Sequence, residues 1–194
     1  MADSRYYPDQ WHEYCRFAQT MREIDHSKWN QFAARYRAAA SFQYAEFMKM
    51  SQRSVSGYSV GMKLLLSYSA FEYACAASNI DHNLHQILIE DSIKSQVFKK
   101  IDKVFGVHTD ARRNLRTSIT SKKLLSKVDD FFEGRSQNLQ PICASLRHMI
   151  AHGQWTPTAT NTLTRECKLL FEQLSQQLLK GSDQLLGNFV SSMD

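Results

Sequence analysis

Apolar residues recur every three or four positions along most of the chain, which is the spacing of one face of an α-helix. This pattern predicts helices over about 9–25, 28–53, 54–79, 84–105, 110–132 and 141–153, and a last helix from 163. Gly181 is expected to interrupt the last helix, and the apolar residues beyond it are expected to extend the helix and pack against a partner. The chain has only 7 Gly and 3 Pro in 194 residues, which favours long helices over many short strands. The expected fold class is therefore all-α, a helical bundle.

The segment 54–79 is expected to be the central helix of this bundle. Apolar side chains cover most of its circumference, and such a helix belongs in the interior. Small residues on one side repeat at 3-4-3 spacing, which lets another helix approach closely: Ser67, Ala70, Ala74 and Ala77. Glu72 stands out as an acid in this element. Because a buried carboxylate needs a cation or hydrogen-bond donors, Glu72 should pair with some nearby Lys or Arg, or brace Arg147.

The first fifty residues hold eleven of the 22 aromatic side chains, with arginines interleaved, a composition that suits a base-stacking surface. However, five residues follow the 4-3-4-4 spacing of one helix face: Phe32, Tyr36, Ala39, Gln43 and Phe47. Acidic residues here also nearly cancel the basic ones. We therefore interpret these aromatics as packing, with residues 1–53 forming a helical extension packed on a core of residues 54–194 within a single domain.

Basic residues concentrate between Lys94 and Lys127. Ten lie there against two acids, so this segment carries +8 although the whole chain carries +5. Such a field attracts polyanions such as RNA, and the alternative interpretation is a solvated helix face. Spacing of i, i+4 places the basic residues on two helix faces near one connection. The candidate RNA-binding residues are Lys99, Lys103, Arg112, Arg113, Arg116, Lys122 and Lys123.

The composition argues against several classes of protein. Contents of 43% apolar and 22% charged residues are those of a folded globular chain. No apolar run approaches the ~18 residues of a membrane span, and the first residues lack a signal-peptide core. The four cysteines are scattered, without a Cys-x-x-Cys pair. They predict reduced, mostly buried thiols in a cytoplasmic protein, not a disulfide scaffold or a zinc knuckle.

The densest polar chemistry lies in the stretch Arg147-His148-Met149-Ile150-Ala151-His152-Gly153. On a helical wheel of about 100° per residue, one side of this helix is apolar and faces the core: Ile142, Leu146, Met149 and Ile150. Arg147 lies at one edge of the opposite face, and His148 and His152 lie together at the other edge. Between these edges lie two small side chains, which leave a shallow surface that we call the low floor: Ala144 and Ala151.

These residue types suit cleavage of a phosphodiester. Arg147 stays protonated and presents parallel N–H donors that stabilise charge on phosphate oxygens in the transition state. Imidazole can take a proton from a ribose 2′-hydroxyl or give one to the leaving oxygen near neutral pH. With Gly153 as a left-handed C-cap, the helix dipole favours protonated His152. Arg147 and His152 are about 140° apart on the wheel, so one phosphate would meet both more readily in a cleft shared by two copies.

The stretch from Arg147 to His152 resembles the Arg-x4–6-His motif of HEPN (higher eukaryotes and prokaryotes nucleotide-binding) domains, in which Asn, Asp or His usually follows the Arg, as His148 does here. The resemblance implies an up-and-down all-α bundle that dimerises through its motif helices. It also implies a metal-independent endoribonuclease of toxin–antitoxin, phage-defence or RNA-processing systems, which leaves 2′,3′-cyclic phosphate ends and uses no cofactor. By this resemblance Arg147 and His152 are catalytic and His148 supports them. The implied partners are RNA, a second copy of the chain and a neutralising protein.

A metal site is the first alternative. His148 and His152 have the i, i+4 spacing of helical zinc pairs. However, Met149 stands where such motifs carry a general-base Glu, and the only further donors to consider are distant in sequence, His82 and His85. We therefore expect no metal in the reaction.

A second alternative is a non-catalytic module for dimerisation or for binding nucleotide or RNA. In that case Arg147 pairs with Glu72, and the two histidines of the motif are ordinary exposed polar residues. Arg and His four residues apart do not by themselves decide between a nuclease and such a module.

Overall fold

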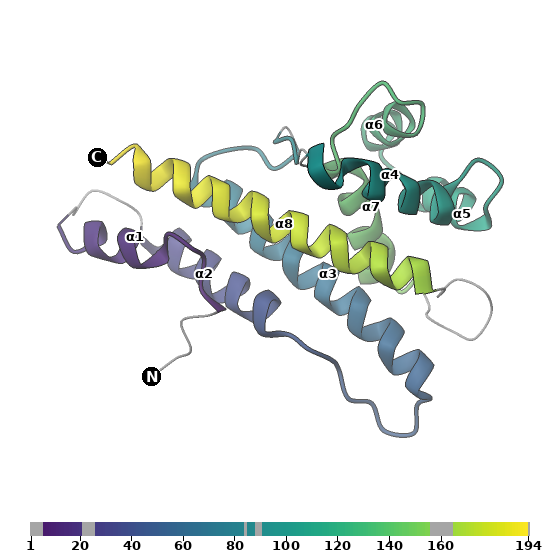
Figure 1. Cartoon of the computed structure of the whole chain (residues 1–194), viewed down its shortest axis with the longest axis horizontal. Coiled ribbons are helices and arrows are strands. Elements are labelled where there is room, and N and C mark those ends of the chain that lie inside the picture. Colours follow the sequence, from purple (N-terminus) through teal and green to yellow (C-terminus); the bar gives the residue numbers. More distant parts are fainter. Residues whose placement is uncertain (1–5, 21–25, 84, 88–90, 156–164, 194) are drawn as a thin grey trace. The chain divides into compact units, whose positions relative to one another are not determined.

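The computed structural model describes residues 6–20, 26–83, 85–87, 91–155 and 165–193, and these residues form helices and connections without a β-strand. The all-α class predicted from the sequence is confirmed for them. In chain order the helices are α1 (Trp11–Ala18), α2 (His26–Ser41), α3 (Gln52–Ala77), α4 (Asp91–Phe105), α5 (Asp110–Ser118), α6 (Lys122–Phe132), α7 (Gln140–Ala151) and α8 (Arg165–Ser191) (Figure 1). Across this described part, no helix combines the length and apolar character that crossing a bilayer requires.

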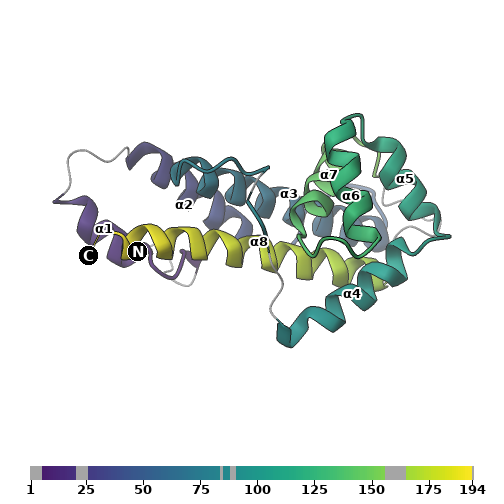
Figure 2. The same cartoon turned by 90° about the horizontal axis from the view of Figure 1, so that it is seen from above.

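The chain divides into two compact units, and two long helices contribute to both. Unit 1 lies within 1–42, 66–85 and 176–194, and unit 2 within 43–65 and 86–175. Helices α3 and α8, the longest in Figures 1 and 2, begin in unit 2 and end in unit 1. Their first turns meet in unit 2, where Lys168 Nζ donates to Ser56 Oγ at 2.7 Å. Unit 1 therefore combines segments that come before and after residue 53, the domain boundary expected from the sequence, and unit 2 includes residues on both sides of it.

Unit 1 has an aromatic core built by α1, α2 and α8. Tyr14 and Trp29 are each 1% exposed. Both rings lie against Phe189, with ring centroids 6.4 Å and 4.7 Å away. Phe32 meets Trp29 edge to face at 5.7 Å, a favourable aromatic geometry. These N-terminal rings are packing residues, as the helical spacing predicted.

The prediction of a helix over 28–53 is wrong beyond residue 41, because residues 42–51 are not helical and connect α2 to α3. The apolar face is right up to Ala39, which is fully buried. Past it, Phe47 packs against Tyr58 of α3, with ring centroids 5.2 Å apart. Ala45 N–H donates to the Ser59 hydroxyl at 2.9 Å. Contacts with the next helix thus replace helical hydrogen bonds, which local spacing does not reveal.

The expected helix over 84–105 begins later, at Asp91. Residues 85–87 are not helical, and Leu84 lies outside the described residues. The backbone of Ile87 instead pairs with the segment before α7: its N–H donates to Asn138 Oδ1 at 2.9 Å, and its carbonyl accepts from Leu139 N–H at 3.1 Å. This long-range pairing holds residue 87 out of a helix.

The prediction of a single helix over 110–132 is also wrong, because α5 and α6 are separate helices. Thr109 caps α5, and its hydroxyl accepts from Arg112 N–H at 3.2 Å. Ser121 caps α6 in the same way, accepting from Leu124 N–H at 3.3 Å. A serine that bonds the backbone locally competes with a continuous helix, so the chain breaks at 119–121.

Gly181 does not interrupt the last helix, contrary to the sequence expectation, since α8 runs unbroken from Arg165 to Ser191. Residues expected to extend toward a partner are instead buried within unit 1: Leu185, Leu186 and Val190. Glycine costs only about 1 kcal/mol within a helix, which packing of this apolar face offsets.

Asp183 on α8 is a partly buried carboxyl in unit 1. The Tyr36 hydroxyl donates to it at 2.5 Å, and the Asp9 backbone N–H donates to it at 3.2 Å. Burial raises the pKa of Asp183 to about 6, and the nearby Asp9 charge adds to the rise, against the lowering effect of both hydrogen bonds.

Asp183→Asn should therefore change the pH dependence of stability. The folded pKa of about 6 lies above the ordinary value of 3.8, so stability from protonated Asp183 is present below that value and lost as the pH rises through about 6. The asparagine oxygen still accepts from Tyr36 but never ionises. In urea unfolding, the variant should gain on the order of 2 kcal/mol over wild type between about pH 4 and about pH 8. A difference independent of pH would contradict this.

Candidate functional site

The helix that carries the Arg-His stretch, α7, is held in unit 2 by its apolar side. Ile142, Leu146 and Met149 are buried, as the helical wheel predicted. Ile150 is only partly buried and lies beside Gly61 of α3, where a β-carbon would come 3.6 Å from Ile150 Cγ2. With this side packed, α7 turns its other side toward solvent.

The start of α7 is held by the side chain of Asn138. Asn138 Oδ1 accepts from the backbone N–H of Gln140 at 3.0 Å and also from that of Ile87. Pro141 stands in the first turn, where a missing N–H costs no helical hydrogen bond. One asparagine thus fixes both the first turn of α7 and its link to residue 87.

The end of α7 is the predicted left-handed glycine turn. Gly153 has a φ of +66°. Its N–H donates to the Ile150 carbonyl at 3.1 Å, and Gln154 N–H donates to the Met149 carbonyl at 2.9 Å, the paired bonds of a Schellman motif. His152 is the C-cap residue, so it stands at the negative end of the helix dipole.

Gly153→Ala should destabilise the protein by about 1 kcal/mol, because a β-carbon disfavours positive φ although space is open around it. Gly181→Ala is the matched control, since that glycine also has open space but lies inside α8. It should stabilise by up to about 1 kcal/mol. Urea unfolding measures both changes, and equal signs for the two variants would contradict this account of the α7 end.

The partly exposed side of α7 brings the two imidazoles together. The rings of His148 and His152 have centroids 4.3 Å apart and are tilted by 51°. Burial lowers the pKa of His148, and the charges of His152 and Arg147 lower it further. Ala151 is exposed and Ala144 partly so, consistent with the expected low floor. The site thus offers a neutral imidazole, a second imidazole and a nearby guanidinium.

Glu72 is less buried than its apolar surroundings in the sequence indicated. Its side chain is 28% exposed, and its Oε1 lies 3.7 Å from Nε2 of His82. Both residues belong to unit 1, whereas Arg147 belongs to unit 2. A carboxylate at the surface keeps part of its hydration, so it does not demand a buried cation. The pairing of Glu72 with Arg147 stays a prediction.

The candidate RNA-binding residues lie on three helices, not two, and several are paired. The ion pairs are Lys103 with Glu166 at 2.7 Å, Arg113 with Asp110 at 2.8 Å and Arg116 with Asp129 at 2.9 Å. Arg112 lies over the Phe132 ring, 4.3 Å from its centroid. Lys99, Lys122 and Lys123 are exposed and form no ion pair with the residues that the structure describes. The charge count over 94–127 missed Asp129 and Glu166 because both lie outside that segment.

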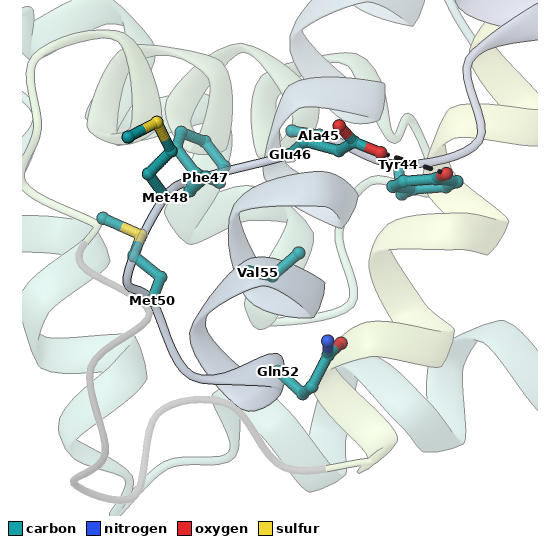
Figure 3. Close-up of a pocket in the computed structure, with 8 residues that line it drawn as sticks. All are labelled: Tyr44, Ala45, Glu46, Phe47, Met48, Met50, Gln52 and Val55. Atoms are coloured by element: carbon teal, nitrogen blue, oxygen red, sulfur yellow. Dashed lines mark hydrogen bonds between the residues drawn. The ribbon is translucent and has the colours of Figure 1, made fainter.

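A pocket of about 520 Å³ lies elsewhere in unit 2, beside the first turn of α3 (Figure 3). Its lining is Tyr44, Ala45, Glu46, Phe47, Met48, Met50, Gln52 and Val55. Figure 3 shows both methionines at one end and Tyr44 at the other, its hydroxyl donating to Glu46 at 3.3 Å. None of the candidate catalytic residues lines it. The sequence pattern missed this pocket because it predicted helix through residue 53.

No group of three or more His, Cys, Asp or Glu side chains within the described ranges is arranged to hold a metal ion. The four cysteines lie outside any disulfide bond, and three of them are buried, as predicted: Cys75, Cys143 and Cys167. Comparisons with known proteins found no match for this chain among family models, curated proteins or solved structures.

Proposed function

We propose that Arg147, His148 and His152 form the site of a metal-independent endoribonuclease, in an HEPN-like bundle. The observation that carries the proposal is the pair of imidazoles 4.3 Å apart at a partly exposed helix end, with Arg147 on the same helix. Attack of a ribose 2′-hydroxyl on the adjacent phosphate would leave a 2′,3′-cyclic phosphate. The resemblance of this stretch to the HEPN motif supports the same reaction and a role in toxin–antitoxin systems, phage defence or a stress response.

The environments of the two histidines support different roles. His148 has a lowered pKa and accepts the 2′-hydroxyl proton as a neutral imidazole. His152 stands at the C-terminal end of α7 and gives a proton to the leaving 5′-oxygen. Arg147 donates to the phosphate oxygens on which negative charge develops. No step in this scheme uses a metal ion.

The proposed cleft forms between the α7 helices of two copies. Ala144 and Ala151 support this arrangement, because small side chains on that face let a second helix approach. Two-fold symmetry would also place an arginine of one copy near the histidines of the other. Size-exclusion chromatography with light scattering should give a dimer. A strict monomer that cleaves RNA would contradict the shared cleft.

The nuclease proposal is tested by incubating the purified protein with labelled RNA in excess EDTA. Cleavage should proceed at the same rate as without the chelator. Activity that EDTA removes and Mg²⁺ restores would contradict the metal-independent mechanism. Dimeric protein that binds RNA without cleaving it would favour the alternative function, a non-catalytic RNA-binding or dimerisation module.

RNA binding should depend on the exposed Lys122 and Lys123 more than on the arginines that form ion pairs. Replacing Lys122 and Lys123 by Ala should reduce the slope of log affinity against log salt by about 1–2, because each lysine releases about one counterion from a bound phosphate. The control replaces Arg113 and Arg116 by Ala, whose carboxylate partners already balance them. A filter-binding series over salt measures both slopes. A larger change in the arginine variant would contradict this prediction.

A further inference from the structure

His148 and His152 also have the geometry of a two-ligand metal site. One helical turn separates them, and their ring centroids lie 4.3 Å apart. Two imidazoles on one zinc ion have ring centres roughly 5 Å apart, since Zn–N bonds are about 2.0–2.1 Å long. The observed ring separation therefore differs from that of two imidazoles on one ion by on the order of 0.7 Å, a change that side-chain rotation can supply.

The surroundings of the two rings admit a cation. Exposed Ala151 and Gly153 leave the space beside His152 open to solvent. The ion would lie near the C-terminal end of α7, whose carbonyl dipoles favour positive charge. Arg147 is also positively charged, so its guanidinium disfavours the ion.

We propose that His148 and His152 together bind one borderline transition-metal ion, represented by Zn²⁺, with water in its other positions. Imidazole is a preferred ligand of this class of ion. Because no third His, Cys, Asp or Glu of the described residues completes the site, the ion exchanges readily and does not hold the fold together. The bound ion blocks RNA cleavage by occupying the nitrogens that transfer protons, and this second half rests on the proposed nuclease.

Binding is measured without any activity assay, by titrating Zn²⁺ into the apoprotein in competition with a chromophoric chelator. Wild type should take one ion per chain at this site. His148→Gln and His152→Gln keep side chains of similar size and should each lower the affinity at least about tenfold, since each removes one of two ligands. His108→Gln is the matched control, because His108 is exposed in the connection between α4 and α5.

Imidazole proton resonances add a readout for the geometry. Zn²⁺ should shift the ring signals of both His148 and His152 together, and a shift confined to one ring would overturn the shared site. Equal Zn²⁺ uptake by wild type and the double variant His148→Gln with His152→Gln would also overturn it. Circular dichroism confirms that the variants are folded.

Cleavage of labelled RNA in EDTA separates failure of this inference from failure of the nuclease proposal. Cleavage in EDTA that Zn²⁺ inhibits, with the same midpoint as binding, supports both halves. Cleavage that continues at saturating Zn²⁺ overturns the inhibitory half. Zinc binding without any RNA cleavage supports the metal site and overturns the nuclease, together with the inhibition that rests on it.

Discussion

His152→Ala is expected to slow RNA cleavage by about 10²- to 10⁴-fold, the usual contribution of a positioned acid or base. The variant loses the imidazole at the C-cap of α7 and leaves the apolar side of that helix unchanged. Arg147→Ala should cause a comparable loss by removing the donor to the developing phosphate charge. The cleavage rate of Arg147→Lys should lie between those of wild type and Arg147→Ala, because lysine keeps the charge but loses the paired N–H donors. Single-turnover rates in EDTA measure all three.

The control for His152→Ala is His108→Ala, which removes another exposed histidine, in the connection between α4 and α5. Its cleavage rate should equal that of wild type. Unfolding curves of both variants separate chemical effects from loss of fold. A folded His152→Ala protein that cleaves RNA at the wild-type rate would remove His152 from the mechanism.

Trp29→Ala is expected to destabilise unit 1 by about 3–5 kcal/mol, the range for removing a buried aromatic side chain. Trp29 is 1% exposed and touches three aromatic rings, those of Tyr14, Phe32 and Phe189. Its removal therefore leaves a cavity where α2 packs against α1 and α8. Urea unfolding followed by circular dichroism measures the loss.

The same experiment separates packing from base stacking as the role of the N-terminal aromatics. Tyr44→Ala is the control, because Tyr44 is 60% exposed and its loss should change stability by less than about 1 kcal/mol. RNA affinity of Trp29→Ala, measured where the variant is folded, should equal that of wild type. A folded variant with weakened RNA binding and unchanged stability would instead indicate a stacking surface.

Helical spacing predicted the features that depend on neighbours in the sequence. The buried side of α7 and its glycine end both follow from residues within one or two turns. For the same reason the histidine pair was foreseeable, since an i, i+4 spacing places two side chains on one face of any helix.

Features set by distant contacts were not predictable in this way. Residues 42–51 follow an apolar spacing but leave the helix, because Phe47 and Ala45 interact with α3. Ile87 is held by Asn138, some fifty residues later in the chain. Arg116 forms an ion pair with Asp129 of the following helix, so it is less available to bind RNA. Each outcome depends on which segments meet in space.

The most direct test of the central claim compares an RNA oligonucleotide with its 2′-deoxy analogue, each incubated with wild-type protein in EDTA. The proposed mechanism needs the 2′-hydroxyl as nucleophile, so only the RNA should be cut, and its new ends should be 2′,3′-cyclic phosphates. Equal cleavage of both oligonucleotides, or intact RNA at protein concentrations where it is bound, would contradict the assignment of Arg147, His148 and His152 as an RNA-cleaving site.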